Sequence, residues 1–237
     1  MKAVLLLACL FCQAGALPAQ DAAHNRLTAA ERAAGWQLLF GGVSTAGWLE
    51  VTGRPFPTES WTIEDGCLKA FPGLKGNQDI RTSGTYVSFE FEFAWRILKD
   101  GNSGVKYLVQ NTDRWTNAQG LQARARGPEY QLADDAGPDA SDATRVTGAL
   151  YSVLAPTRRP SHAPGEWNQG RLVVHGENVE HWLNGERVLA YSLTQPEVVA
   201  LLRQHRKGSD VIRTSPICLQ NHGTAVWFRD LKVRVLE

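Results

Sequence analysis

The chain has 237 residues, of which 43% are hydrophobic and 9% aromatic, and its formal net charge is +1. This length and apolar content suffice for one sizeable core, and a single all-β domain can fill it. Acidic and basic residues are mixed without long runs of one sign. The chain therefore offers no basic stripe for a phosphate backbone, which excludes a typical nucleic-acid-binding protein.

The amino terminus is typical of a secretory signal peptide. Lys2 precedes the apolar run Ala3–Phe11, and small residues follow that run. The run is too short to span a bilayer, so we predict no transmembrane segment. We expect a signal peptide at 1–19, cleaved near residues 16–20, and a periplasmic or secreted domain at 20–237. Cleavage would remove Lys2 and bring the net charge from +1 to zero.

Two cysteines would remain after cleavage, Cys67 and Cys218. Export to an oxidising compartment makes a disulfide between them possible. Two buried free thiols on separate strands are the alternative. The Cα–Cα distance decides between the two, and the sequence leaves both open.

A short helix is predicted before the strands begin. Thr28 and Glu31 form a capping box, and this helix ends near Gly35. Residues 86–97 then form the clearest strand, because apolar and polar residues alternate along it and one face is buried. The residues predicted to face the core are Val87, Phe89, Phe91, Phe93, Trp95 and Ile97.

More short strands follow with turn residues between them. Asn184-Gly185 predicts a tight hairpin, and a slip of the inward phase after Phe228 predicts a bulge near Asp230. A second short helix opens at Thr194. With no βαβ alternation, this pattern predicts an all-β sandwich or jelly roll with two short peripheral helices, in one domain. The additional strands are expected at 105–110, 129–133, 149–154, 171–175, 179–183, 187–193, 216–219 and 225–235.

The stretch 127–137 places polar residues where a strand ends. If Tyr130 and Leu132 pack inward, Glu129 and Gln131 point together to the other face, which is either an ordinary solvated face or a groove. Several acids fall within 14 residues of chain here. They can form a site for a hard cation or a solvated acidic loop; they are Glu129, Asp134, Asp135, Asp139 and Asp142.

Other residue patterns narrow the chemistry. The six histidines have no metal-ligand spacing, which disfavours a zinc site built from neighbours. No nucleophile elbow, HExxH, phosphate-binding Gly loop or dinucleotide fingerprint is present. Of the eight Trp, Trp115 in a polar stretch is the best candidate for an exposed platform under a sugar ring. Core packing explains the others we considered, Trp36, Trp48, Trp61 and Trp95.

A set of segments, taken in chain order, resembles the 3-keto-disaccharide hydrolase domain family. This family was formerly a domain of unknown function and has a concanavalin-like sandwich. The matches span nearly everything after the signal peptide. They are GWQLLFGG (35–42), WTIEDGCL (61–68), FEFEFAWRI…GNSGVKY (89–107), PEYQLADD (128–135), GALYSVLAP (148–156), GEWNQGRLVVHGENVEHWLNGERV (165–188) and ICLQNHGTAVWFRDLKVRVL (217–236).

The resemblance implies an enzyme that cleaves glycosides already oxidised to a ketone at C3. A C3 carbonyl acidifies the C2 proton, so a base can form an enolate and the glycosidic oxygen can leave by elimination. Water then adds across the double bond, for net hydrolysis. Such a site needs a base, a donor for the leaving oxygen, and a cation or donors at the C3 oxyanion. The resemblance also implies that the binding partner is a small-molecule sugar substrate.

The same resemblance and chemistry suggest roles for individual residues. Glu129 is the base or a metal ligand, and Asp134 is a second ligand or base, which leaves room for a divalent cation such as Ca²⁺ or Mn²⁺. His181 is the donor to the leaving oxygen. The substrate-binding candidates are Gln131, Asn102, Lys106, His222 and Trp115.

One position departs from the family. Gly137 stands where the family pattern has a His in the acidic turn. If that His is a ligand or base in relatives, this protein has either lost activity or replaced the group. Two further hypotheses stay open beside the enzyme: a non-catalytic carbohydrate-binding module, and a structural or interaction domain. The enzyme predicts a groove in which Glu129 meets His181 or Asn102. A binding module predicts exposed aromatics along a shallow face.

Overall fold

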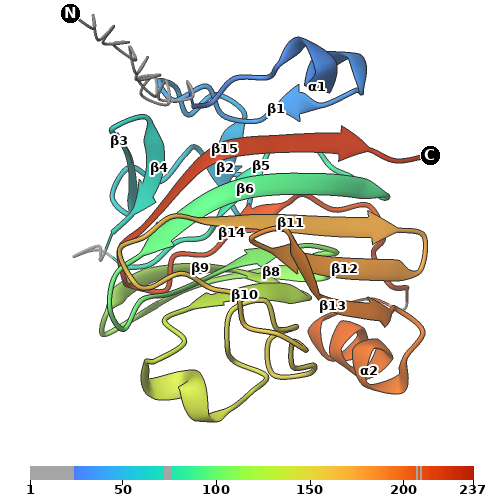
Figure 1. The fold of residues 1–237 in the computed structure, drawn as a ribbon. Helices are drawn as coiled ribbons and strands as arrows, with labels where there is room; N and C mark the ends of the chain where they lie inside the picture. The colour runs from blue at the N-terminus through green and yellow to red at the C-terminus, as the bar shows by residue number, and fades with distance from the viewer. Residues whose placement is uncertain (1–23, 72–75, 207, 209) are drawn as a thin grey trace, which may run out of the picture.

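A computed structural model describes residues 24–71, 76–206, 208 and 210–237. The predicted signal peptide lies outside the described residues. The described chain forms a large and a smaller antiparallel β-sheet, a separate hairpin and two α-helices, which confirms the all-β sandwich (Figure 1). In the part described, no helix is long and apolar enough to cross a membrane.

The larger sheet has eight strands in the order β13-β12-β11-β6-β15-β4-β3, with β1 paired to β15. Its long central strands β6 and β15 carry most of the pairing, and β11 lies on the other side of β6 (Figure 1). The strands are β1 (Gln37–Leu38), β3 (Trp61–Glu64), β4 (Cys67–Ala70), β6 (Phe89–Ile97), β11 (Asn168–His175), β12 (Asn178–Leu183), β13 (Glu186–Ser192) and β15 (Val226–Val235).

The smaller sheet has five strands in the order β10-β7-β14-β5-β2 and packs against the inner face of the larger one. A hairpin of β8 and β9 forms a separate two-stranded sheet, and an isolated bridge between Gln78 and Ala123 joins it to the segment before β5. These strands are β2 (Trp48–Glu50), β5 (Ile80–Thr82), β7 (Asn102–Lys106), β8 (Asn111–Asn117), β9 (Gly120–Arg126), β10 (Glu129–Ala133) and β14 (Cys218–Leu219).

The core follows the predicted alternation of β6 with one exception. Phe89, Phe91 and Phe93 are almost completely buried between the sheets, with Trp95 and Ile97. Val87 was predicted to join them and is 52% exposed, so that prediction is wrong. The reason is local: β6 begins only at Phe89, and Tyr86 is bridged to Ser215 of another segment.

The turn predictions are confirmed. Asn184 and Gly185 both have positive φ, 48° and 84°, as a two-residue hairpin turn between β12 and β13 requires. Asp230 also has positive φ, 54°, and the β15–β6 register shifts between Arg229 and Lys232. This is the predicted bulge.

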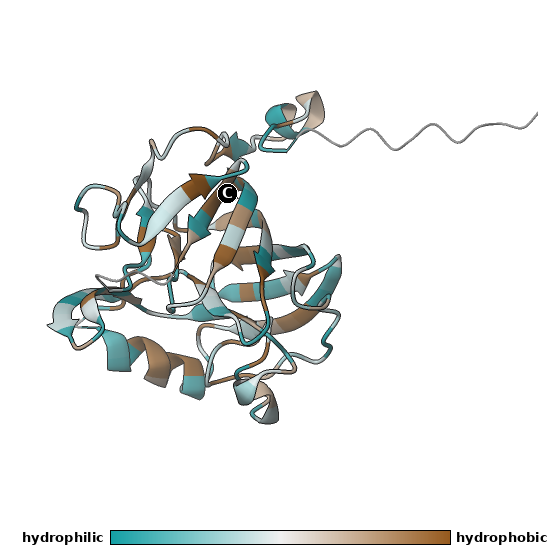
Figure 2. Ribbon diagram, turned by 90° about the vertical axis from the view of Figure 1, so that its left-hand side faces the viewer, coloured by the Kyte–Doolittle hydropathy of each residue, from teal (hydrophilic) through white to brown (hydrophobic). Residues whose placement is uncertain are grey.

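Both helices form where the sequence placed them. α1 (Ala29–Ala33) has the complete Thr28 capping box. α2 (Pro196–His205) begins after Gln195, slightly later than expected, with Pro196 in its first turn. A short 3₁₀-helix, η1 (Pro138–Ser141), follows the acidic turn. Figure 2 shows that α2 mixes hydrophobic and hydrophilic residues along its length, and Val198 and Leu202 anchor its buried side.

Two strand predictions differ from the structure. Residues 149–154 form turns with isolated bridges instead of a strand. The predicted strand 105–110 lies earlier, as β7, and the hairpin β8–β9 was not predicted at all. That hairpin places only small residues, Ala123 and Ala125, against the sheet beside Cys218, so its hydrophobic periodicity is weak.

Of the four cysteines, the two within the described ranges, Cys67 and Cys218, are free buried thiols. Cys67 lies on β4 of the larger sheet and Cys218 on β14 of the smaller one. Burial raises the pKa of both thiols. The free-thiol alternative is therefore the one that the structure adopts.

Candidate functional site

A group of polar residues gathers on the outer face of the smaller sheet. Lys106 of β7 and Glu129 of β10 are direct cross-strand partners, and Gln220 follows β14 next to them. Their strand neighbours Val105 and Tyr130 are buried in the core. Since side chains alternate along a strand, the three polar residues share the opposite face.

These residues line a cavity of about 220 Å³. Its lining comes from β7 and β10 of the smaller sheet, from β9, from the segment that follows β14 and from helix α2. It is lined by Lys106, Arg124, Ala125, Arg126, Gly127, Glu129, Tyr151, Leu201, His205, Gln220 and His222. We call it the Glu129 pocket.

Asp79, just before β5, organises the floor of this pocket. Its carboxylate is fully buried and accepts hydrogen bonds from Lys106 Nζ at 3.2 Å and from Arg124 Nη1 at 2.9 Å. It also accepts the backbone N–H groups of Ala125 and Asn221, at 3.1 and 3.2 Å. One buried carboxylate thus fixes two cations and ties the β9 strand to the sheet.

Glu129 is 9% exposed and is held from two sides. Its Oε2 lies 3.5 Å from Lys106 Nζ and accepts a hydrogen bond from Gln220 Nε2 at 3.3 Å. Gly104 makes room for it on β7, because a Cβ there would lie 2.2 Å from Glu129 Oε1. Gln220 Oε1 is buried without a hydrogen-bond partner among the described residues.

The two central charges influence each other's protonation. Burial raises the pKa of Glu129, and the positive charge of Lys106 opposes only part of that rise. Burial acts to lower the pKa of Lys106, but the carboxylates of Asp79 and Glu129 outweigh it and the pKa is raised. Lys106 therefore stays a cation, while Glu129 is a stronger base than an exposed carboxylate, as general-base catalysis near neutral pH requires.

Two histidines stand at the rim of the pocket. Desolvation and the cations Arg126 and Lys106 lower the pKa of His205, at the end of α2. Desolvation, Arg124 and Lys106 lower that of His222. Both rings are therefore neutral at pH 7, where each can donate through one nitrogen and accept through the other.

His181 does not reach this pocket. It is fully buried between the sheets, where its Nε2 lies 2.7 Å from Tyr107 Oη and its Nδ1 lies 2.9 Å from the carbonyl oxygen of Gly148. Burial lowers the pKa of His181 to about 4. Its ring packs against Tyr130 and does not line the Glu129 pocket, so the structure does not bring it together with Glu129.

Asp134 also lies apart from Glu129. Its oxygens accept the backbone N–H groups of Asp100 and Ala136, at 2.9 and 3.0 Å, so it shapes a turn. It lines a different cavity of about 410 Å³, beside Trp95 and His162. Gly137 follows in the same turn, with its N–H 2.8 Å from the Asp134 carbonyl oxygen.

The remaining predicted substrate residues divide between these places. Lys106 and His222 line the Glu129 pocket. Gln131 is fully buried, and its Nε2 donates to Asn102 Oδ1 at 3.4 Å, outside the pocket lining. Trp115 is 38% exposed on β8, with the guanidinium of Arg126 5.6 Å from its ring centroid.

The residues present do not fit the predicted cation site. Glu129 and Asp134 line different cavities, and the carboxylates nearest the pocket are paired with Lys106 and Arg124. Among residues 24–71, 76–206, 208 and 210–237, no three His, Cys, Asp or Glu side chains are grouped to hold a metal ion. We therefore derive no chemistry through a metal.

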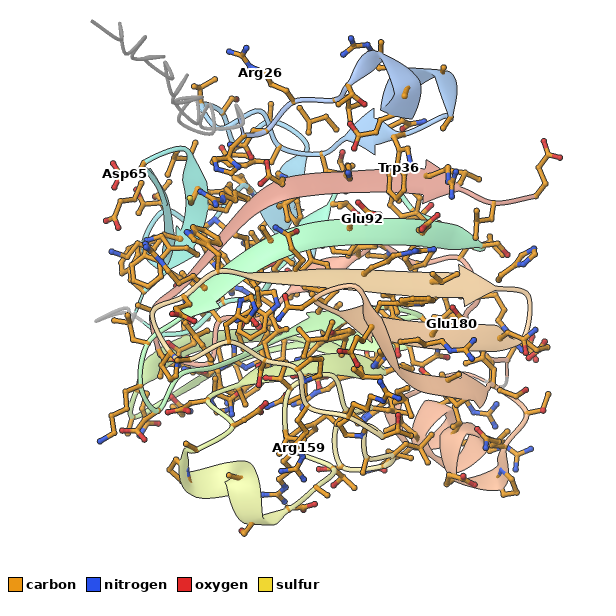
Figure 3. All side chains as sticks on the ribbon, in the orientation of Figure 1. Arg26, Trp36, Asp65, Glu92, Arg159 and Glu180 are labelled. Atoms are coloured by element: carbon orange, nitrogen blue, oxygen red, sulfur yellow. The ribbon has the colours of Figure 1, made fainter. Side chains whose placement is uncertain are left out.

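The opposite outer face, on the larger sheet, is differently built. Figure 3 shows Trp36, Glu92 and Glu180 spread across it. Lys232 pairs with Glu92 at 2.8 Å and lies over the Trp36 ring at 5.2 Å, and Arg187 pairs with Glu180 at 2.7 Å. These charges neutralise one another along the sheet, whereas the Glu129 pocket concentrates them around a cavity.

Several pocket residues were not singled out in the sequence, namely Asp79, Arg124, Gln220 and His205. The alternation of small apolar and polar residues in Gly120–Arg126 was the available signal for Arg124, which points away from Ala123 and Ala125. Asp79 and Gln220 carry no sequence signal of their own, because the contacts that define them join segments far apart in the chain.

A two-sheet sandwich with a charged pocket on one outer face defines the class: an all-β sandwich protein whose buried charges surround a cavity. Residues 35–234 match the profile of the 3-keto-alpha-glucoside-1,2-lyase-like domain. The chain belongs to that family.

Individual relatives agree with this assignment. A 3-keto-disaccharide hydrolase of Bacteroides thetaiotaomicron is 31% identical over 231 residues, covering 86% of this chain and 79% of that protein. A structure of a candidate glycosyl hydrolase from Parabacteroides distasonis is 28% identical, with TM-score 0.75 over 91% of this chain and 100% of that one. A second from the same organism, 24% identical with TM-score 0.64, covers 85% and 99% and supports the fold.

Proposed function

We propose that this protein cleaves the glycosidic bond of 3-keto-glycosides, including 3-keto-disaccharides, by enolate formation, elimination and hydration. The observation that carries the proposal is Glu129, a carboxylate of raised pKa that faces the cation Lys106 in a pocket. The family and the related hydrolase support a carbohydrate-active hydrolase. The reaction path rests on the pocket chemistry.

Glu129 is the base that removes the C2 proton. The electron pair of the C2–H bond moves to form a C2–C3 double bond, and the C3 carbonyl oxygen becomes an oxyanion. Gln220 donates to Glu129 Oε2 and keeps the carboxylate in place, so it is a positioning residue. General-base catalysis of this kind contributes about 10²–10⁴ in rate.

Lys106 stabilises the developing oxyanion. Its Nζ is nearly buried and already oriented by Asp79 and by the carbonyl oxygen of Ala125, at 3.2 Å each. A cation fixed in advance stabilises new negative charge without rearranging. Arg124, bound to the other oxygen of Asp79, adds positive potential to the same floor.

The enolate then expels the glycosidic oxygen. His205 and His222, at the rim, are the side chains placed to donate a hydrogen bond to it. Water adds at C1 and gives up one proton, the departed alkoxide takes up one proton through solvent, and protonated Glu129 returns its proton to C2. This restores the base and gives the 3-keto sugar and the free alcohol. We further propose that the domain acts after export, since its first 19 residues have the composition of a signal peptide.

A non-catalytic binding module is the alternative, and the scarcity of exposed aromatic side chains disfavours it. Such a module would present several aromatic rings along a shallow face. Of the large hydrophobic side chains exposed within the described ranges, Trp115 is the sole aromatic one.

The test compares Glu129→Gln with wild type on a 3-keto-glucoside and on its unoxidised parent. We expect turnover of the keto sugar alone, a loss of about 10²–10⁴ in kcat in the variant, and loss of deuterium uptake at C2 in D₂O. Glu186→Gln, a change at an exposed hairpin residue, is the matched control and keeps full activity. Undiminished turnover by a folded Glu129→Gln variant would remove Glu129 as the base.

A further inference from the structure

A second cavity continues the Glu129 pocket along helix α2. It has a volume of about 470 Å³, and three residues line both cavities: Tyr151, Leu201 and His205. The two cavities therefore adjoin one another. A ligand that reaches past His205 from the Glu129 pocket would enter the second one, which we call the α2 groove.

The α2 groove has a defined direction. Glu197, Leu201 and His205 follow one another at intervals of four residues, so they lie in one row on the helix surface. At 1.5 Å per residue, the row is about 12 Å long. His205 lies at the Glu129 end, because it lines both cavities, and Glu197 lines only the far cavity. The groove is long enough for a six-membered ring beyond the bond that breaks.

The opposite wall is a rigid turn. Tyr151 donates its N–H to the carbonyl oxygen of Glu129 at 3.0 Å, which ties this wall to the catalytic strand. Ser152 has positive φ, 58°, and its N–H is bonded to the Thr144 carbonyl oxygen at 2.9 Å. The N–H of Val153 is bonded to the Leu150 carbonyl oxygen at 2.9 Å. The wall is therefore formed before any ligand binds.

The lining changes character along this path. The Glu129 pocket is built from charged and amide side chains, as a polyhydroxylated ring requires. Beyond His205 the apolar surface of Leu201, Ala200, Val153 and the Tyr151 ring is accompanied by the polar residues Ser152, Glu197 and Gln204. A second sugar has several hydroxyl groups that need partners, and those facing this surface would lose water without replacement. A flat aromatic ring loses nothing there and gains apolar contact.

We propose that the α2 groove binds the leaving group of the substrate and selects a flat aromatic, phenol-type group over a second hexose. This rests on the proposed function, in which Glu129 removes the C2 proton of the sugar at the other end of the path. It makes 3-keto aryl glycosides the preferred substrate class of this chain.

The chemistry of departure agrees with this choice. A phenol has a pKa near 10, like the tyrosine side chain, whereas a water-like alcohol lies near 15.7. A phenolate therefore leaves with little help from an acid. Desolvation and the neighbouring cations lower the pKa of His205, which makes it neutral and a weak acid at pH 7. A hexose leaving group would need a stronger proton donor than neutral His205.

The step balances without another reagent. Glu129 takes the C2 proton, the C1–O bond breaks with both electrons on the phenol oxygen, and the phenolate takes a proton from solvent. Water then adds at C1 and the proton of Glu129 returns to C2. The products are the 3-keto sugar and the phenol.

The experiment places a bulky side chain in the groove. Ala200→Trp changes an exposed helix residue that lines it, and Arg203→Trp puts the same side chain on exposed α2 surface outside the lining. Each is assayed on 3-keto glucosides with phenyl, glucosyl and methyl leaving groups. Binding of unoxidised phenyl glucoside and of a glucose disaccharide to each protein is measured by calorimetry.

We expect wild type to prefer the phenyl over the glucosyl substrate by about tenfold or more in kcat/KM, the size of a lost apolar contact in a pocket. Ala200→Trp should remove that preference and weaken phenyl glucoside binding, while methyl substrate turnover and the Arg203→Trp variant stay near wild type. Equal use of both leaving groups by wild type, or equal slowing of the methyl substrate by Ala200→Trp, overturns the inference.

The binding arm separates the two proposals. If no keto-glycoside is turned over but Ala200→Trp weakens phenyl glucoside binding, the proposed reaction fails and the groove assignment stands. If Ala200→Trp leaves that binding unchanged, the groove assignment fails whatever the activity.

Discussion

Gly104→Ala tests the catalytic geometry without touching a functional group. Gly104 lies on β7, and its φ is outside the left-handed region, so the backbone accepts alanine. The new Cβ would lie 2.2 Å from Glu129 Oε1 and 2.7 Å from Glu129 Cγ and Cδ. An ordinary van der Waals contact is about 3.4 Å or more, so the carboxylate must move by about 1 Å.

A displacement of this size should be costly for the reaction. Misplacement of a catalytic group by about 1 Å lowers the rate by about 10²-fold, so we expect kcat/KM for a 3-keto-glucoside to fall by that factor. The added methyl group also overpacks the space around Glu129, which should lower the free energy of unfolding by about 1–3 kcal/mol. In a Glu129→Ala background, Gly104→Ala should cost less stability than it does in the wild type, because the clashing Glu129 atoms are absent.

The assays are steady-state kinetics and urea unfolding of the single and double variants. Gly41→Ala is the matched control, because nothing lies within 4 Å of its Cβ and its φ is also permissive. A folded Gly104→Ala protein with wild-type kcat/KM would refute the assignment of Glu129, since the carboxylate cannot both move and act from its original position.

Three further results are expected. Activity should fall as the pH drops through the raised pKa of Glu129, because the base must be deprotonated; in Lys106→Met the acidic limb of the kcat/KM profile should move to higher pH, and an unmoved limb would contradict the ion pair. His181 has a folded pKa of about 4 against 6.5 unfolded, so the unfolded state binds more protons between these values. Stability should therefore fall by about 3 kcal/mol from pH 6.5 to 4, and His181→Gln should flatten this slope in urea unfolding. EDTA should leave turnover unchanged, because Lys106 and Arg124 already pair the carboxylates of the pocket floor; loss of activity restored by Mn²⁺ or Ca²⁺ would show a metal.

Local signals in the sequence were sufficient for much of the fold. The Asn184-Gly185 turn needs two residues with positive φ, and those residue types accept it. The bulge at Asp230 was visible as a phase slip, and β6 as strict alternation. Each depends on neighbours in the chain alone, so no tertiary knowledge was needed.

The error about His181 has a physical cause that the sequence already contained. Val179, His181 and Leu183 share one phase of β12, and the two apolar members indicate that this phase faces the core. His181 stays in this buried phase although the β12–β13 register shifts just after it, and Tyr107 and the Gly148 carbonyl oxygen satisfy its nitrogens. Strand phase was the better guide than the chemistry of the side chain.

The pocket itself depends on registers that no single segment reveals. Glu129 meets Lys106 because β10 and β7 pair in one particular register, and Asp79 meets Arg124 because β9 folds back over β5. Buried charges are stable only when paired, so these four residues form two cations against two carboxylates. Removing Asp79 would leave both cations without their shared partner. Its place beneath Glu129 and Lys106, the proposed base and oxyanion donor, therefore makes it the structural centre of the pocket floor, although it does not line the cavity.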